Sequence, residues 1–144
     1  MTTTFENTVE IGRSRGEVFS YLAELGNLPA WNYAIKRTVR HSPGPVGVGT
    51  LYIQERSLPR PMTEELTVTA FEPDSLLRVS GGFGPYTGSS TYELTSAGDG
   101  GTLLRNTIEL EPQGILSALA AIATRKVKSA VAENLLVLKK ILES

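Results

Sequence analysis

The sequence predicts an α+β fold in which a bent antiparallel sheet packs on one long C-terminal helix. Between residues 50 and 111, segments rich in alternating polar and apolar residues are separated by turn-forming residues, as in an antiparallel meander. From Gln113 to Leu142, apolar residues recur instead at the three- and four-residue steps of a helix. Such a helix is roughly 45 Å long, so only a broad curved sheet could cover its apolar face.

Length and charge limit the classes of function. The chain has 144 residues, which is enough for one domain with a hydrophobic core and too few for two, so we expect a single domain over residues 1–144. A formal net charge of -1 leaves no basic footprint, and no nucleic-acid partner is expected. The nearly apolar run over residues 115–123 is shorter than the ~20 residues that cross a bilayer. Without a signal-peptide pattern or a transmembrane segment, we expect a cytoplasmic protein.

The reactive residue types are scarce. The chain has no cysteine, which excludes disulfides, thiolate metal sites and cysteine nucleophiles. His41 is the only histidine, so a metal site would need carboxylates around one imidazole, and a nucleophile-histidine pair would depend on that residue. We therefore expect no metal and no other cofactor.

The N-terminal part predicts one strand followed by two short helices. Phe5 to Ile11 alternates apolar and polar residues, as in a half-buried strand. Ser14 precedes Glu17 by three residues, the capping-box arrangement that begins a helix. Residues 28–32 predict a second short helix or turn, in which Pro29 is tolerated at the first helical position.

The rest of the chain predicts strands and turns before the final helix. Another strand begins at residues 39–41, and the proline- and glycine-rich loop 42–49 follows. The segment Gly81-Gly82-Phe83-Gly84-Pro85 lacks the lysine and the following helix of a phosphate loop, so a flexible hairpin at the mouth of a cavity is expected. The meander strands are predicted over residues 50–56, 64–71, 76–82, 89–95 and 102–111.

Short motifs in a fixed order extend over essentially the whole chain. They are Phe5-Glu6-Asn7, Val18-Phe19-x-Tyr21-Leu22, Asn27-Leu28-Pro29-x-Trp31, residues 44–50, Phe71-Glu72-Pro73, Gly98-x-Gly100-Gly101-Thr102-Leu103 and Asn134-Leu135-x-x-Leu138-Lys139. Together they resemble the START-like (SRPBCC) superfamily, in its polyketide cyclase/dehydrase subfamily. The resemblance implies a helix-grip fold, in which a curved antiparallel sheet grips the C-terminal helix around a hydrophobic cavity. Because this superfamily contains lipid carriers, metabolite binders, co-chaperone-like domains and aromatase/cyclases, it does not select one function.

Two asparagines are predicted to face the interior. Asn106 shares one side of its strand with Leu104 and Ile108, and Asn134 interrupts the apolar stripe of the helix. A polar group on a core-facing line must be hydrogen-bonded or border a cavity. The two amides could therefore bond to each other or to a backbone carbonyl, or they could orient a polar group of a ligand.

The inner side of the strand over residues 50–56 stays open. Either Leu51 and Ile53 or Tyr52 and Gln54 could face inward. Because side chains alternate along a strand, an error of one residue reverses the whole set.

Four further residues are candidates for ligand contact. Tyr86 and Tyr92 offer an apolar ring with a polar tip, although such tyrosines are also ordinary core residues. Trp31 is more typical of a packing anchor than of a ligand platform. Glu64 has inner parity at the start of its strand, where a rim carboxylate in water is more common than a buried acid.

The sequence favours a binder of a small hydrophobic molecule that resembles a lipid, a polyketide or an aromatic metabolite. We expect a cavity of roughly 300 to 1,000 Å³. A cyclase or dehydratase that removes a proton next to a carbonyl is the alternative, with Glu64 as its candidate base. A co-chaperone-like interaction module is a second alternative, and bulky side chains would then fill the cavity. The identity of the ligand, and the choice between monomer and homodimer, are not encoded in any motif. The predicted ligand-binding residues are Trp31, Glu64, Tyr86, Tyr92, Asn106 and Asn134.

Overall fold

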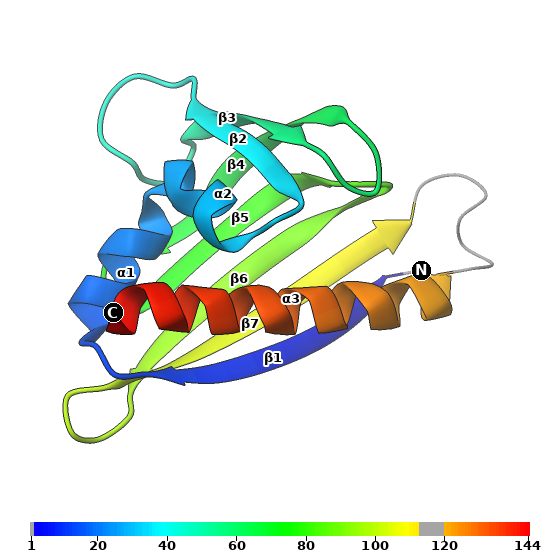
Figure 1. Cartoon of the computed structure of the whole chain (residues 1–144). Coiled ribbons are helices and arrows are strands. Elements are labelled where there is room, and N and C mark those ends of the chain that lie inside the picture. The colour runs from blue at the N-terminus through cyan, green and yellow to red at the C-terminus, as the bar shows by residue number, and fades with distance from the viewer. Residues whose placement is uncertain (1, 113–119) are drawn as a thin grey trace.

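The computed structural model describes residues 2–112 and 120–144. Its seven strands form one sheet in the order β1-β7-β6-β5-β4-β3-β2, with antiparallel pairing throughout. The elements are β1 (Thr3–Ile11), α1 (Arg15–Ala23), the 3-10 helix η1 (Leu25–Asn27), α2 (Leu28–Trp31), β2 (Ile35–Arg40), β3 (Leu51–Arg56), β4 (Met62–Glu72), β5 (Leu76–Phe83), β6 (Tyr86–Ser96), β7 (Thr102–Pro112) and α3 (Ala120–Glu143). Figure 1 shows α3 lying across one face of the curved sheet. This is the predicted helix-grip arrangement.

The predicted N-cap Ser14 begins α1, but Glu17 accepts from the Ser14 hydroxyl and not from its backbone N–H, as a capping box would require. The backbone N–H of Glu17 donates to Oγ of Ser14 at 3.2 Å, and that hydroxyl donates to Oε1 of Glu17 at 3.1 Å. The helix buries Val18, Phe19 and Leu22. The local signal therefore fixes where α1 begins, and the apolar side chains fix which face packs inward.

Two strands begin three or more residues before the predicted position. The strand expected at residues 39–41 is β2, which begins at Ile35. The sequence pattern did not show this start, because a register shift between Ile35 and Arg37 interrupts the alternation of side chains. β6 begins three residues before the predicted 89, because Gly84 and Pro85 alone form the turn between β5 and β6. The predicted start of the last helix at Gln113 lies outside the described residues.

Glycines permit a close approach of the backbones of β5 to β4 and of β6 to β7. Gly81 faces Gly88 where β5 pairs with β6. A Cβ atom on Gly81 would lie 2.0 Å from the carbonyl oxygen of Glu65, and one on Gly88 would lie 2.0 Å from that of Glu109. No other residue type fits at either position, and glycine kinks of this kind let a sheet curve.

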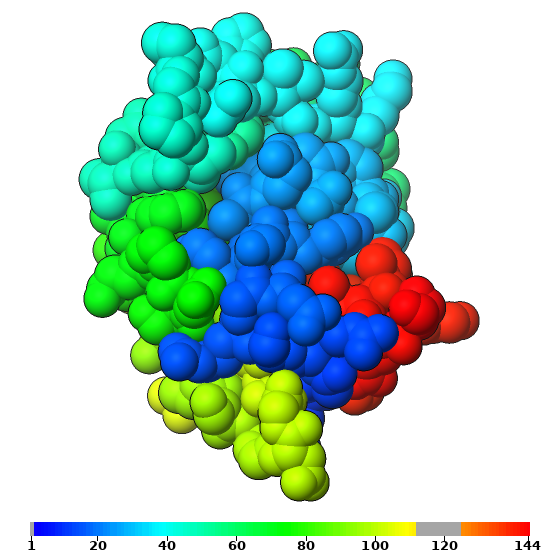
Figure 2. Space-filling view, turned by 90° about the vertical axis from the view of Figure 1, so that its left-hand side faces the viewer, coloured from blue at the N-terminus to red at the C-terminus, as the bar shows by residue number. Residues whose placement is uncertain are grey.

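The C-terminal end of α3 is fastened to the segment that follows β1. The backbone N–H of Gly12 donates to Oε2 of Glu143 at 2.7 Å, and Nε of Arg13 donates to the carbonyl oxygen of Leu142 at 2.7 Å. Lys139 Nζ donates to Glu143 Oε2 at 2.7 Å. Figure 2 shows this end of the helix packed against the N-terminal part of the chain. The contacts fix the position of α3 along the sheet.

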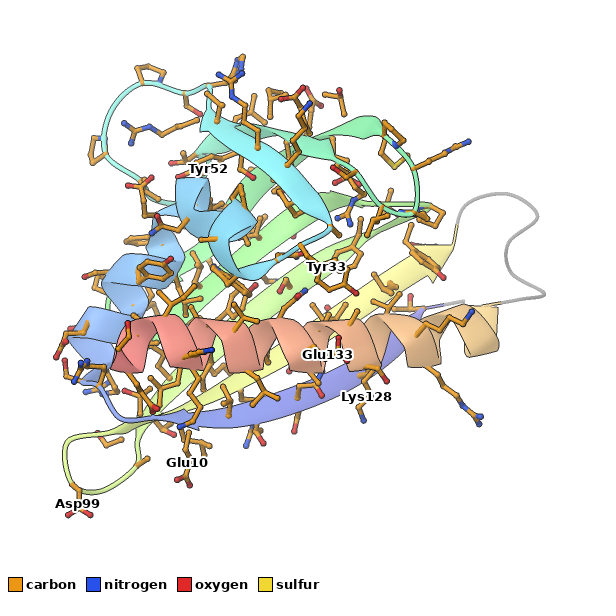
Figure 3. The ribbon with its side chains drawn as sticks, viewed as in Figure 1. Glu10, Tyr33, Tyr52, Asp99, Lys128 and Glu133 are labelled. Atoms are coloured by element: carbon orange, nitrogen blue, oxygen red, sulfur yellow. The ribbon has the colours of Figure 1, made fainter. Side chains whose placement is uncertain are left out.

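This fastening should weaken in acid. The hydrogen bond from Lys139, and then that from Gly12, hold the pKa of Glu143 below its ordinary value. The pKa of Glu143 is lower in the folded state than in the unfolded state. The ionised carboxylate therefore stabilises the fold fully at pH values above the ordinary glutamate pKa, and this stabilisation is lost as the pH falls through the folded-state pKa. Glu143→Gln should lower stability at neutral pH and flatten its acid dependence in urea unfolding. Glu133→Gln, on the exposed side of the same helix (Figure 3), is the control. If the free energy of unfolding of Glu143→Gln falls in acid as steeply as that of the wild type, the role of this contact is contradicted.

The open question of the inner side of β3 is resolved by burial. Tyr52 is 2% exposed and Gln54 is 3% exposed, whereas Leu51 and Ile53 are only partly buried. Tyr52 belongs to the main core, on the side of β3 that the short helices cover (Figure 3). Its hydroxyl is the one fully enclosed side-chain polar atom in the described part of the chain that has no hydrogen-bond partner.

Removing this hydroxyl should stabilise the protein. Tyr52→Phe deletes an enclosed polar group that makes no bond, so we expect the free energy of unfolding to rise by about 1 kcal/mol. Tyr33→Phe, at a tyrosine that is 59% exposed, should leave it unchanged. Urea unfolding of the three proteins measures the difference, and a loss of stability in Tyr52→Phe would show that the hydroxyl is satisfied.

Candidate functional site

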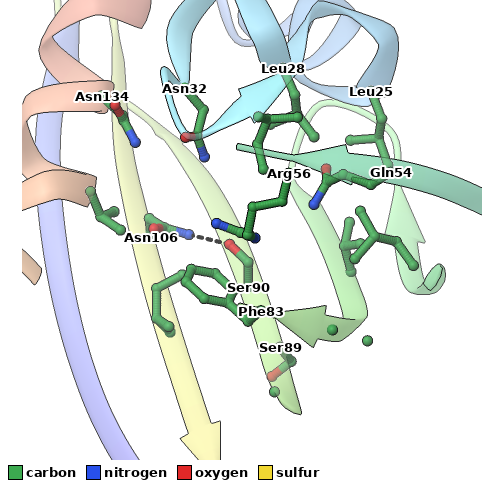
Figure 4. A pocket seen from close by; sticks show the side chains of 18 of the residues that line it. Leu25, Leu28, Asn32, Gln54, Arg56, Phe83, Ser89, Ser90, Asn106 and Asn134 are labelled. Atoms are coloured by element: carbon green, nitrogen blue, oxygen red, sulfur yellow. Dashed lines mark hydrogen bonds between the residues drawn. The ribbon is translucent and has the colours of Figure 1, made fainter. Parts of the chain in front are cut away.

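Two neighbouring cavities lie on the concave side of the sheet, beneath α3 and α2. The inner cavity has a volume of about 70 Å³ and the outer one about 260 Å³. Figure 4 shows the side chains around the inner cavity. The two cavities share the lining residues Asn32, Arg56, Phe83, Val131 and Asn134.

The cavities are smaller than the predicted range of 300 to 1,000 Å³. Large side chains occupy much of the space between helix and sheet, and among the walls of the inner cavity these include Trp31, Arg56 and Tyr92. Trp31 packs edge-on against Tyr92, with 6.4 Å between ring centroids. The space available to a ligand therefore consists of a narrow inner cavity and a wider outer cavity.

Asn106 borders the inner cavity and is fixed by the sheet. It is 1% exposed, and its Nδ2 donates to Oγ of Ser90 at 2.9 Å and to the carbonyl oxygen of Thr91 at 3.1 Å. Figure 4 shows the bond to Ser90. The predicted inward orientation of Asn106 is thus observed, and of the alternatives left open by the sequence this residue makes the bond to a backbone carbonyl.

Asn134 lies on α3 and borders both cavities. It is 5% exposed, yet its side-chain amide makes no hydrogen bond to the residues that the structure describes, Asn106 included. The amide atoms of Asn134 are not fully enclosed by protein. They therefore border cavity space and not packed core. Asn134 can therefore bond to a molecule in the cavity.

Glu64 is buried and paired, so its prediction as a rim carboxylate in water is wrong. The side chains of Arg56 and Glu64 are 8% and 3% exposed. Nε of Arg56 donates to both carboxylate oxygens of Glu64 at 3.0 Å. The sequence pattern could not show this pairing because the two residues lie on different strands, and a buried glutamate needs such a partner.

Two further groups donate to Glu64, and a third holds one of them in place. Nε2 of Gln54 donates to Oε1 of Glu64 at 2.9 Å, and the backbone N–H of Gly84 donates to Oε2 at 2.5 Å. Gln54 itself accepts a hydrogen bond from Oγ1 of Thr38 at 3.0 Å. The hairpin turn predicted at the cavity mouth does border the outer cavity, but it is held there by Glu64.

These contacts leave Glu64 poorly suited to remove a proton from a ligand. Its oxygens accept four hydrogen bonds, and it does not line either cavity. Its clear effect is to hold Arg56, which lines both cavities. Nη1 of Arg56 donates to the carbonyl oxygen of Leu58 at 3.4 Å, and Nη2 donates to none of the described residues. Arg56 therefore presents an unused donor at the junction of the cavities.

The predicted aromatic residues divide between the two cavities. Trp31 and Tyr92 line the inner cavity and Tyr86 lines the outer one. Burial raises the pKa of Tyr92 more than the hydrogen bond with Ser90 lowers it, so the hydroxyl stays neutral. No carboxylate or histidine is present among the described residues that line either cavity.

Sequence reasoning missed Arg56, Asn32 and Phe83. Arg56 has the same parity as Tyr52 and Gln54 and so would have followed from the correct inner side of β3. Once Gln54 is placed opposite Glu64 in the strand register, an arginine two residues further on is a natural partner for the carboxylate. No comparable signal identifies Asn32 or Phe83, whose positions depend on how α2 and the hairpin fold back over the sheet.

The chain belongs to the family described as polyketide cyclase / dehydrase and lipid transport, whose model matches residues 2–143. No curated protein matches the chain. Among the solved structures similar to it is that of Ara h 8.0201, with a TM-score of 0.76 and 16% identity, covering 99% of this chain and 98% of that one.

Two aromatase/cyclase structures are also similar. The Zhui aromatase/cyclase from Streptomyces sp. R1128 has a TM-score of 0.81 and 10% identity, covering 99% of this chain and 94% of that one. The di-domain aromatase/cyclase StfQ from the steffimycin biosynthetic pathway has a TM-score of 0.80 and 14% identity, covering 99% of this chain and 51% of that one. At these identities the similarity shows a shared fold alone.

The described part of the chain lacks the features of a membrane-spanning helix and of a metal site. None of the helices there is both long and apolar enough to cross a membrane. The same part of the chain contains no group of three or more metal-ligating side chains that could hold an ion.

The buried ion pair should behave as one unit. Glu64→Leu leaves the Arg56 charge buried without a partner and should cost about 3 to 5 kcal/mol of stability. The double variant Arg56→Met/Glu64→Leu removes both charges and should be more stable than Glu64→Leu alone. Glu65→Leu, at the exposed neighbouring position, is the control. Urea unfolding of these proteins and of Arg56→Met gives the coupling energy, and additive effects of the two substitutions would contradict it.

Proposed function

We propose that the protein binds a small, mostly apolar molecule with an oxygen-bearing end, which lies at the junction of the two cavities. The observation that carries this proposal is that Asn134 and Arg56 line both cavities, while the Asn134 amide and Nη2 of Arg56 make no hydrogen bond to the described residues. Binding sites for small molecules are commonly apolar cavities with a few fixed polar groups, which orient the ligand.

The charge of Arg56 restricts the ligand further. Glu64 lies against the same guanidinium and neutralises it, so a ligand carboxylate would meet a second carboxylate nearby. A neutral acceptor, such as a ketone, an amide carbonyl or a phenol, meets no such repulsion. The ligand class is therefore a neutral apolar molecule with one such group.

The outer cavity suits the apolar body of that ligand. Its walls include Val127, Ala130 and Val131 from α3, and Pro85 and Tyr86 from the hairpin side. The family description and the titles of the aromatase/cyclase structures support lipid-like, polyketide-like or aromatic-metabolite-like molecules as the compounds to try first.

A cyclase-type enzyme is the alternative function. The donors of Arg56 and Asn134 could polarise a ligand carbonyl, as such chemistry requires. Proton abstraction also needs a base, and the described cavity walls offer no carboxylate and no histidine. This favours binding without proton abstraction. The interaction module without ligand is disfavoured by the outer cavity of about 260 Å³, which side chains leave open.

The two asparagines provide the test, because only one is fixed by the protein. The probe is naphthol, a fluorescent phenol. Asn134→Leu removes an amide without a partner among the described residues, so stability should stay within about 1 kcal/mol of the wild type. The affinity for naphthol should fall. Asn106→Leu strands the carbonyl oxygen of Thr91 and should cost about 1 to 3 kcal/mol of stability. Urea unfolding and fluorescence titration with naphthol measure the two effects.

Two outcomes would contradict the assignment of Asn134. One is a large loss of stability in Asn134→Leu with unchanged naphthol affinity, because the amide would then serve the fold. The other is the absence of saturable naphthol binding to the wild type.

A further inference from the structure

Phe83 lies where the inner and outer cavities meet. It is the last residue of β5, and it is the one aromatic side chain among the described residues that line both cavities. The guanidinium carbon of Arg56 lies 5.3 Å from the centroid of its ring. Figure 4 shows the ring near Arg56 and Ser90. The ring therefore lies beside the donor that a ligand must reach.

The backbone at Phe83 is held on both sides. Phe83 pairs with Tyr86 across the hairpin, and the next residue, Gly84, donates its N–H to Glu64 at 2.5 Å. On the other side, Gly82 packs closely on Glu64, because a Cβ atom there would lie 3.0 Å from the Glu64 Cβ. The position of the Phe83 Cα is thus fixed by the same carboxylate that holds Arg56.

The Phe83 ring is less constrained than its backbone. It is only partly buried, and it borders cavity space on two sides. A cation–π contact at a partly exposed site is weak, so a ligand can displace the ring from Arg56 at modest cost. The ring can therefore separate the two cavities without making the boundary rigid.

We infer that Phe83 is a specificity-determining residue that sets how deeply a ring system enters. This inference rests on the proposed function and narrows its ligand class. The inner cavity, at about 70 Å³, is large enough for a narrow oxygen-bearing end but not for a further ring beside Phe83. The outer cavity holds the ring system. The favoured ligand has a compact aromatic or alicyclic body and a slender carbonyl or hydroxyl end.

Two fluorescent phenols of increasing length, naphthol and anthrol, test the inference. The wild type should bind naphthol more tightly than anthrol. Phe83→Ala joins the two cavities, so it should shift the ratio of the two affinities towards anthrol by at least about tenfold, because the additional ring becomes buried. Phe83→Leu, which keeps an apolar side chain at this position, should give a smaller shift in the same direction.

Phe71→Ala is the matched control. Phe71 packs edge-on against Phe19, with 5.3 Å between ring centroids, and it lines neither cavity. Its replacement removes an aromatic side chain from the fold, but the ratio of the affinities should stay unchanged. Thermal unfolding identifies the variants that remain folded, and Phe83→Leu decides the question if Phe83→Ala does not fold.

An unchanged ratio in folded Phe83 variants would overturn the inference while leaving the proposed function intact. An equal shift in Phe71→Ala would also overturn it. If neither phenol binds to any of the proteins, the proposed function fails. Whether Phe83 separates the two cavities is then judged from crystals of the wild type and of Phe83→Ala under xenon. Continuous xenon density across both cavities in the variant alone supports the partition, and identical density in the two proteins overturns it.

Discussion

The buried carboxylate of Glu64 imposes a constraint on three parts of the chain. An ionised group away from water must be hydrogen-bonded on several sides, and here the donors come from Arg56 and Gln54 on β3 and from the turn after β5. The turn must approach closely, which Gly84 permits with a φ of 62°. Because Nε of Arg56 is used by Glu64, the far end of the guanidinium is directed to the junction of the cavities. One interaction thus shapes the hairpin and places the polar end of the site.

The long helix supplies the opposite wall. Its C-terminal end is fastened to Gly12 and Arg13, and Leu135 and Leu138 pack into the core. Asn134 precedes Leu135 and borders the cavities, and its side chain is not paired with any of the described residues. Two polar groups from separate elements, Asn134 from α3 and Arg56 from β3, therefore converge on one space that apolar side chains largely enclose. Such a pair can select the orientation of a ligand with little polar surface.

The sequence predicted features that depend on local or periodic signals. The Ser14 cap is local, and the inward positions of Asn106 and Asn134 follow from the alternation and the helical period around them. It could not decide the inner side of β3, because apolar residues occur at both parities there. It also placed Glu64 in water, because the partner Arg56 is brought to it by strand register, which alternation within one strand does not encode. The size of the cavity depends on how large side chains pack, and no pattern in the sequence reports that.

The most direct test of the account is whether the cavity donors themselves contact a ligand. Two-dimensional ¹H–¹⁵N NMR follows the side-chain signals of Arg56 Nη2 and Asn134 Nδ2 while naphthol is added. The account predicts saturable shifts of both signals with one common dissociation constant, while the Asn7 amide, which donates to the backbone of Lys128 on the helix, stays unchanged. Saturable binding that leaves Arg56 and Asn134 unshifted would contradict the proposed site.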